Sequence, residues 1–249
     1  MTGTGGKIGY SASGGIYIGR NIRTGFHKHH LNAVVISFSK PFCVQQEHES
    51  EQVCEAAFIP SDLVYRLSTD VDDGTAFIHI DPYSDAGLGL RPDAGRIITM
   101  SRSAFTSVFV ALRDWYLKPE PDEDKVAVLV AMVADVIHIS FFPERRIDER
   151  ILRCIRRMRL TDDGIPSLQI MAKSVFLSAG RFSHLFKEET GISFRAYVQH
   201  CKLIRSLKAI HEHSNLTAAS YEGGFSDQPH FTKTFLKTFG IIPSKVKNS

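Results

Sequence analysis

The sequence SAGRFSHLFKEETGI (residues 178–192) is followed 49 residues later by DQPHFTKTFLKTFGI (residues 227–241), which repeats its pattern. Each copy opens with a residue that caps helices well, has two phenylalanines four positions apart, and closes on Gly-Ile. Residues at i and i+4 lie on the same side of a helix, so the phenylalanines predict one buried face and leave the residues between them exposed. The repeat therefore predicts two similar helices, each packed through its phenylalanines.

A shorter helix and a tight turn are predicted ahead of each copy, which gives the arrangement of a helix-turn-helix. Capping side chains are expected at Ser167, Ser178, Asn215 and Asp227, and helix-ending glycines at Gly191 and Gly240. The predicted helices are Asp148–Arg159, Ser167–Ser174, Ser178–Thr190, Ser193–His213, Asn215–Glu222 and Asp227–Phe239, with a last turn after Pro243. Residues 148–249 are thus predicted to be an all-helical domain.

The N-terminal half of the second helix of such a motif enters the major groove of DNA, where its exposed side chains contact bases. In the first copy these contacts are expected from Ser178, Gly180, Arg181, Ser183 and His184. In the second copy they are expected from Gln228, Pro229, His230, Thr232 and Lys233. Lys187 and Lys237 lie one turn further on and suit phosphates, which position a protein without specifying sequence. The alternative for each of these residues is an ordinary solvated helix face.

The helix predicted over Ser193–His213 joins the two copies. At about 1.5 Å per residue it is roughly 30 Å long, close to the roughly 34 Å of one duplex turn. Two units held this far apart would meet successive major-groove faces on one side of the DNA.

The charge distribution supports a polyanionic partner at the C-terminal end. Residues 151–249 carry 15 Lys and Arg against seven Asp and Glu, whereas residues 1–150 carry 15 against 20. A basic segment in a nearly neutral chain is typical of nucleic-acid binding, although a solvated basic surface would have the same composition.

Residues 148–248 strongly resemble the AraC/XylS family of bacterial transcription regulators. The residues that carry the resemblance are Ala172, Ser178, Phe182, Phe186, Lys187, Gly191, Ser193 and Tyr197 in the first half, and Gly224, Phe225, Asp227, Phe231, Phe235, Gly240 and Pro243 in the second. The resemblance implies sequence-specific binding to double-stranded DNA. It also implies an activator as the family's habit, with RNA polymerase as the partner of an activator.

The chain departs from the family pattern in the second half. An Ile-Ala pair is replaced by Ala219-Ser220, and an Arg and an Ala of the linker helix by Lys202 and Ser206. The closing aromatic-Arg pair is replaced by Val246-Lys247. Because Ala219 and Ser220 should face the core, we expect looser packing and weaker DNA binding in the second copy.

The first ninety residues show the short alternating apolar runs of β-strands, at Ile16–Ile18, Ala33–Phe38, Glu55–Ile59 and Ala76–Ile80. Such strands suggest a small barrel or sandwich. Two helices follow, over Ser103–Leu117 and Lys125–Ser140. The expected fold class is α+β: a small cupin-like β-barrel followed by helices, then the all-α domain with two helix-turn-helix motifs and a linker helix.

The N-terminal part also resembles, more weakly, the cupin-type sensor domain of this family, through His27-Lys28-His29-His30 and Phe58-Ile59-Pro60. We expect a sensor domain over 1–95, a helical dimerisation segment over 96–147 and the DNA-binding domain over 148–249. The resemblance implies a small-molecule effector and a homodimer. From strand position, the effector pocket is expected at His29, Phe38, Tyr65 and His79. A filled barrel that serves only as a dimer platform is the alternative.

A metal-dependent cupin enzyme with a vestigial DNA-binding tail is the competing hypothesis, because His27 and His29 with Glu47 or Glu49 could ligate a metal. Tyr65 stands where the third His is expected, and His48 and His79 are the remaining candidates. The chain has no nucleophile elbow and no phosphate-binding loop sequence. We therefore expect no catalytic residues, no metal and no cofactor.

The expected location is the cytoplasm. Four cysteines lie far apart with no Cys-x-x-Cys pair, which argues against a disulfide framework or a thiolate zinc site. The start MTGTGGKIGY has no apolar core, so no secretory signal is expected. The apolar run 126–142 contains Asp135 and His138 and is too short and polar for a membrane span, so no membrane partner is expected.

Overall fold

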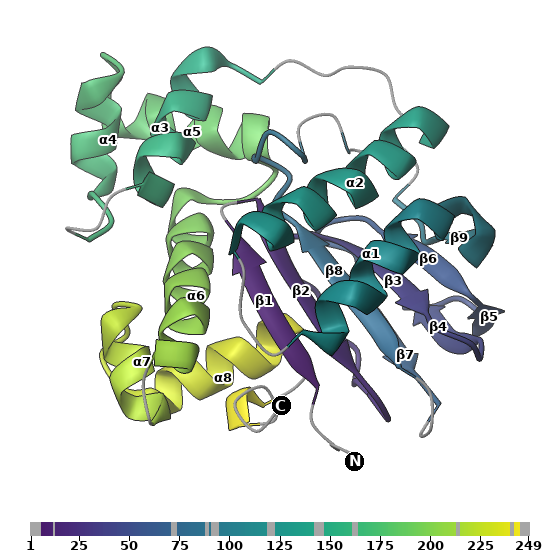
Figure 1. The fold of residues 1–249 in the computed structure, drawn as a ribbon. Helices are drawn as coiled ribbons and strands as arrows, with labels where there is room; N and C mark the ends of the chain where they lie inside the picture. Colours follow the sequence, from purple (N-terminus) through teal and green to yellow (C-terminus); the bar gives the residue numbers. More distant parts are fainter. Residues whose placement is uncertain are drawn as a thin grey trace. The chain divides into compact units, whose positions relative to one another are not determined.

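The computed structural model describes residues 6–11, 13–70, 74–87, 90, 95–118, 123–141, 147–160, 164–212, 215–239 and 242–244. The chain forms two compact units, one of residues 1–144 with 232–249 and one of residues 145–231, and the last long helix contributes to both. In the described residues, strands, two long helices and most of the last long helix build the first unit, and helices alone build the second (Figure 1).

The described strands form two antiparallel sheets. The larger sheet has the order β1-β2-β8-β3-β6-β9 and the smaller has the order β5-β4-β7. The strands are β1 (Lys7–Ser11), β2 (Gly14–Gly19), β3 (Asn32–Ser37), β4 (Phe42–Gln46), β5 (Gln52–Cys54), β6 (Ala56–Ile59), β7 (Tyr65–Ser68), β8 (Thr75–Ile80) and β9 (Ile98–Met100). The α+β class expected from the sequence is confirmed.

The larger sheet has two apolar faces, as β3 shows. All six of its residues are buried, and successive side chains of a strand point to opposite faces. Val34 and Ile36 therefore join the core under the helices, whereas Ala33 and Val35 join the core that also contains Phe42 of the smaller sheet. Both faces of the strand pack, which explains its unbroken apolar sequence.

Helices cover one face of the larger sheet (Figure 1). They are the short 3₁₀ helix η1 (Arg102–Phe105), α1 (Thr106–Leu117) and α2 (Glu123–Phe141). Trp115 is the largest side chain of this core and is 1% exposed. A Cβ atom at Gly9 of β1 would lie 2.6 Å from the indole and 2.7 Å from Val126, so only glycine lets the strand approach these helices.

Lys7 of β1 ties the first strand to the end of α1. Its Nζ atom donates a hydrogen bond of 2.5 Å to the carbonyl of Trp115 and a second to the carbonyl of Lys118. The same ammonium lies 4.4 Å from the centre of the Trp115 ring. The last carbonyls of a helix have no partner within the helix, and a cation there also opposes the negative end of the helix dipole.

The strands do not close into the barrel that the sequence suggested. The larger sheet ends at the edge strands β1 and β9. Strand β7 of the smaller sheet meets the segment between β2 and β3 through the isolated bridges Arg23–Ser68 and His27–Tyr65. The N–H of Thr24 also donates a hydrogen bond of 3.0 Å to the Leu67 carbonyl of this strand. The strands of the smaller sheet have three to five residues, and none of these described strands is paired in a ladder with a strand of the larger sheet. Within the described residues, the sandwich alternative is the better description.

The C-terminal helices begin and end within two residues of the predicted bounds. They are α3 (Glu149–Leu160), α4 (Leu168–Ser174), α5 (Ala179–Thr190), α6 (Phe194–Glu212), α7 (Leu216–Glu222) and α8 (Gln228–Phe239). Ser167, Ser178 and Asn215 cap their helices as predicted. Gly191 ends α5 in the left-handed conformation at φ 78°, whereas Gly240 and Val246-Lys247 lie outside the described residues. None of the helices in the described part of the chain is long and apolar enough to cross a lipid bilayer.

Candidate nucleic-acid interface

The first helix-turn-helix consists of α4, its turn and α5. Phe182 and Phe186 are fully buried and pack edge-on against Phe194 of α6, with ring centres 5.6 and 5.5 Å apart. At the start of α5, the hydroxyl of Ser178 accepts a hydrogen bond of 3.3 Å from the N–H of Arg181. The buried aromatic pair thus fixes which side of α5 faces outward.

The residues expected to contact DNA from α5 lie on this outward side. Ser183 is half-buried, and the others are exposed: Ser178, Gly180, Arg181, His184 and Lys187. The imidazole Nδ1 of His184 lies 3.7 Å from the Glu188 carboxylate, a distance at which the pair attracts only when the histidine is protonated. Arg181 has a free path to solvent at the N-terminal end of the helix, where a major-groove contact would form.

The second helix-turn-helix consists of α7, its turn and α8, and has the same build. Phe231 and Phe235 are buried. The Asp227 carboxylate accepts a hydrogen bond of 2.7 Å from the N–H of His230, which caps α8 and confirms the predicted start signal. That capping bond lowers the pKa of Asp227. Among the expected contacts on α8, Pro229, His230, Lys233 and Lys237 are exposed, and Gln228 and Thr232 are half-buried.

Two of these side chains are positioned by neighbours that the sequence did not indicate. The Thr217 hydroxyl on α7 donates a hydrogen bond of 2.8 Å to the side-chain carbonyl of Gln228. The His230 ring meets the buried Phe225 ring edge-on, with centres 5.3 Å apart. The first contact spans the turn from α7 to α8, and the second joins the turn residue Phe225 to α8, so both depend on the conformation of the turn.

The core of the second copy is close-packed at the positions that depart from the family pattern. Ala219 and Ser220 are both 0% exposed, which confirms that they face the core. A Cβ atom at Gly223 would lie 1.9 Å from Oγ of Ser206 and 2.8 Å from the carbonyl oxygen of Lys202. The small residues here let α7 lie directly against α6, so the expectation of loose packing does not describe this contact.

Helix α6 joins the two copies. It has 19 residues, or about 28 Å at about 1.5 Å per residue. Tyr197 packs its ring against Phe186 with centres 5.6 Å apart, which ties the start of α6 to the first copy.

A buried cluster of histidines and one tyrosine lies between the two sheets of the first unit. The Nδ1–H of His29 donates to the Leu31 carbonyl at 2.7 Å, and the Tyr65 hydroxyl lies 2.9 Å from Nε2 of the same ring. Because Nδ1 carries the proton, Nε2 of the neutral ring accepts and Tyr65 donates. The rings of His29 and His79 meet edge-on with centres 4.9 Å apart, and the ring of His27 lies 4.5 Å from that of Tyr65.

Burial sets the protonation state of this cluster. It lowers the pKa of His29 well below its ordinary value, and the neighbouring His79 and His27 lower it further. Burial also lowers the pKa of His27 and raises the pKa of Tyr65. His29 and His27 are therefore neutral, and Tyr65 keeps its proton, near neutral pH.

Three of the four residues expected in the effector pocket meet in this cluster: His29, Tyr65 and His79. Phe38 does not, because it packs against Phe109 and Tyr116 of α1, with ring centres 5.3 and 6.3 Å away.

The residues of the alternative metal site are not brought together. Glu47, His48 and Glu49 are exposed beyond the end of β4. Both ring nitrogens of His29 are engaged, so it would lose the Tyr65 hydrogen bond on binding a metal. No cluster of three His, Cys, Asp or Glu side chains in the described ranges is arranged to hold a metal ion.

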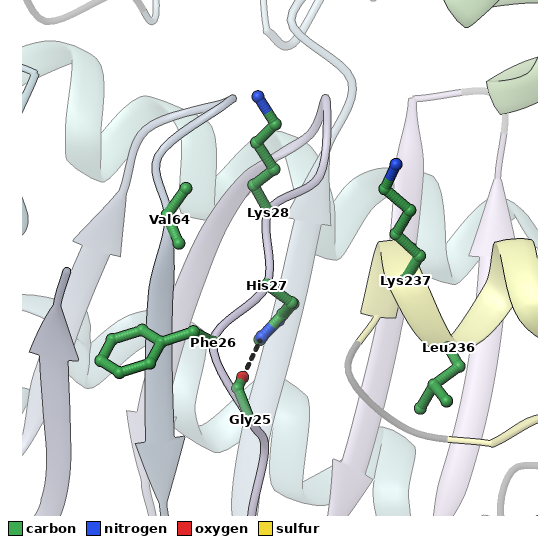
Figure 2. Close-up of a pocket in the computed structure, with 7 residues that line it drawn as sticks. All are labelled: Gly25, Phe26, His27, Lys28, Val64, Leu236 and Lys237. Atoms are coloured by element: carbon green, nitrogen blue, oxygen red, sulfur yellow. Dashed lines mark hydrogen bonds between the residues drawn. The ribbon is translucent and has the colours of Figure 1, made fainter.

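A pocket of about 420 Å³ opens beside this cluster (Figure 2). It is lined by Gly25, Phe26, His27, Lys28, Val64, Leu236 and Lys237. The His27 ring hydrogen-bonds the Gly25 carbonyl at 2.9 Å and forms part of the pocket wall. In the sequence, His27 belongs to the stretch 27–30 that resembles a cupin-type sensor domain, where it is a candidate both for a metal ligand and for part of a polar loop or pocket edge.

Comparison with known proteins identifies the C-terminal region. Residues 171–249 match a family model described as a helix-turn-helix domain. The regulatory protein PocR of Salmonella typhimurium is 29% identical over 99 residues, which are 39% of this chain and 32% of PocR. The match thus spans about a third of that relative's length.

The fold is similar to that of ToxT from Vibrio cholerae. One ToxT structure has a TM-score of 0.62 at 10% identity and covers 98% of both chains. ToxT bound to an unsaturated fatty acid has a TM-score of 0.60 at 11% identity, covering 99% of this chain and 96% of ToxT. ToxT bound to (E)-4-(8-methylnaphthalen-1-yl)but-3-enoic acid has a TM-score of 0.63 at 8% identity, covering 98% and 100%. The C-terminal region is therefore an AraC-type helix-turn-helix domain, in a chain whose two-part fold resembles that of ToxT.

Proposed function

We propose that this protein is a transcription regulator that binds double-stranded DNA in a sequence-specific manner through residues 148–249. The observation that carries the proposal is the repeated helix-turn-helix, in which buried phenylalanines turn a row of polar and basic side chains outward on α5 and again on α8. An exposed polar helix of this width fits the major groove.

Within this interface, Arg181, Ser183 and His184 contact bases from α5. Ser178 and Gly180, at the N-terminal end of this helix, also contact the DNA. Gln228, Pro229, His230, Thr232 and Lys233 do so from α8. Arg, His and Lys donate to guanine, Gln pairs with adenine, and the Thr methyl contacts thymine. Lys187 and Lys237 contact phosphates.

Selection of the full chain against a pool of randomised duplexes at physiological salt tests the proposal. We expect enrichment of two short motifs about one helical turn apart, since α6 separates the two copies by about that distance. A single motif would restrict base contacts to one copy. No enrichment, with and without candidate effectors, would contradict the proposed function.

We further propose that residues 1–95 bind a small-molecule effector. ToxT, whose fold is similar, has been solved with a fatty acid and with an aryl butenoic acid, both of which join a carboxylate to an apolar body. In this chain, His29, Tyr65 and His79 form a polar cluster between the two sheets of residues 1–95. Titration calorimetry with long-chain and aryl carboxylic acids tests this, and no heat from any of them would count against this effector class.

Residues 96–147 are proposed to form a homodimer. Three large apolar side chains on α1 and α2 are solvent-exposed, Val110 at 68%, Leu117 at 72% and Val128 at 57%. Exposed apolar side chains are a feature of protein–protein interfaces, and these helices carry three of them. Sedimentation of the full chain and of its Val110→Glu variant would show whether these helices hold two copies together.

We propose that this protein is an activator that works with RNA polymerase in the cytoplasm. We also propose that it acts as a regulator and not as an enzyme. The support is the AraC-type domain, whose resemblance implies this role. In vitro transcription from a selected site, with and without the protein, distinguishes activation from repression.

A further inference from the structure

The turn between α4 and α5 contains an aromatic residue in a backbone conformation that aromatics rarely adopt. Phe176 has φ 58° and its side chain is 97% exposed. The turn is a Schellman motif: the N–H of Phe176 donates to the Lys173 carbonyl at 3.2 Å, and that of Leu177 to the Ala172 carbonyl at 3.0 Å. The left-handed position of this motif is usually glycine, because a Cβ atom is unfavourable there.

The second helix-turn-helix shows what the same turn requires. Helix α7 ends in an equivalent motif, in which Gly224 donates to the Tyr221 carbonyl and Phe225 to the Ser220 carbonyl. The left-handed residue there is Gly224, at φ 89°. The other described non-glycine residues with positive φ are Asn21, His48 and Asp62, residue types that tolerate this conformation. The fold of the turn therefore does not call for an aromatic side chain.

The side chain of Phe176 also adds nothing to the core, since only 3% of its surface is covered. Phe176 lies two residues before Ser178, which caps the N-terminus of α5. It is therefore next to the end of α5 that would enter the major groove. Lys173 and Arg181 are exposed on either side of it in the sequence. An exposed apolar ring on a segment that also carries exposed cations suits a polyanion that has apolar groups, which is the chemistry of DNA with its deoxyriboses and thymine methyls.

We propose that Phe176 is a DNA-contact residue that packs its ring on a deoxyribose or thymine methyl at the edge of the half-site bound by α5. This inference rests on the proposed function and adds a residue to it. A side chain kept in a disfavoured conformation without any packing in the free protein is consistent with a role in binding.

Phe176→Asn and Phe176→Gly test the inference in the full chain, because both residues suit the left-handed position. We expect both variants to melt at the same temperature as the wild type or higher, and to bind the selected duplex about three- to tenfold more weakly, as expected for loss of a partly buried aromatic contact. Phe176→Tyr keeps the ring and should bind like the wild type. Val53→Ala, which removes an apolar side chain 70% exposed on β5, is the matched control and should bind unchanged.

Salt dependence distinguishes this contact from a phosphate contact. Loss of an apolar contact lowers affinity equally at all salt concentrations, so the slope of log affinity against log salt should be unchanged in Phe176→Asn. Unchanged affinity, or a lower melting temperature in both variants, would overturn the inference. Unchanged DNA affinity with reduced transcription would also overturn it, because Phe176 would then contact a protein partner and not DNA. Failure of the wild type to select any duplex is the separate result that would reject the proposed function itself.

Discussion

Thr217 and Gln228 are joined by a hydrogen bond of 2.8 Å across the turn of the second helix-turn-helix. The bond orients the amide of Gln228, the first residue of α8, before any ligand is present. One lone pair of the carbonyl and both N–H groups remain for a base. Thr217 thus fixes the orientation of Gln228, although Thr217 itself is not among the proposed base contacts.

We expect Thr217→Val to weaken binding to the selected duplex by about two- to tenfold, because an unrestrained Gln228 must be ordered on binding. The preference for adenine at one position should fall at the same time. Thr217→Ser retains the hydroxyl and serves as control. Equal base preference in the Val variant and the wild type would show that the hydrogen bond does not matter for recognition.

Arg181→Ala should reduce affinity by about 1–3 kcal/mol and relax the preference at one position of the site, because a guanidinium contact to a base edge is lost. Competition between the selected duplex and its point mutants measures both effects. A variant with unchanged affinity and preference would remove Arg181 from the interface.

Lys187→Ala should weaken binding to every duplex alike and reduce the salt slope by about one, since a phosphate contact releases a counterion. Affinities at four or more salt concentrations measure the slope for specific and random DNA. A loss limited to the selected site would mean that Lys187 contacts a base.

Ser206→Ala should stabilise the protein by up to about 1 kcal/mol, because it removes a hydroxyl that is buried without a hydrogen bond in the described part of the chain. Ser220→Ala is the matched control: Ser220 is equally buried, but its hydroxyl donates to the Thr217 carbonyl at 2.8 Å. This second variant should be destabilised. Thermal melts that show both variants shifting in the same direction would contradict this account of the α6–α7 contact.

The stability of the first unit should decrease below about pH 6.5. Burial lowers the folded-state pKa of His29 below 6.5, its ordinary value, so below that pH the unfolded chain binds protons that the folded chain excludes. The stability is fully present above pH 6.5 and is lost as the pH falls toward the lowered pKa. His29→Gln should flatten the dependence of melting temperature on pH between 7 and 5, whereas two parallel curves would show that other groups cause it.

The helices could be predicted closely because their signals are local. Ser178 and Asp227 cap helices through hydrogen bonds to residues three positions later, and Phe182 and Phe231 each lie four positions after the cap. The hydrogen bond of Thr217 to Gln228 was missed because it depends on how two helices pack. The strands β4, β5 and β7 were missed because they are short and carry polar residues.

Phe38 shows where strand position alone misleads. It continues the alternation of Val34 and Ile36, which face the helices, and not that of Ala33 and Val35. This parity places Phe38 on the face that the helices cover. His79 lies on the opposite parity of β8 from Ile78 and Ile80, and so faces the smaller sheet with Phe77.

The contact between Lys7 and the end of α1 has a practical consequence for work with this protein. Trimming the chain past residue 7, or attaching a tag that displaces β1, would uncap the carbonyls of Trp115 and Lys118 and loosen the last turn of the helix that bears Leu117. The oligomeric state measured on such preparations would then be that of a protein whose α1 is frayed. Purification handles for assembly studies should therefore be compared at both termini.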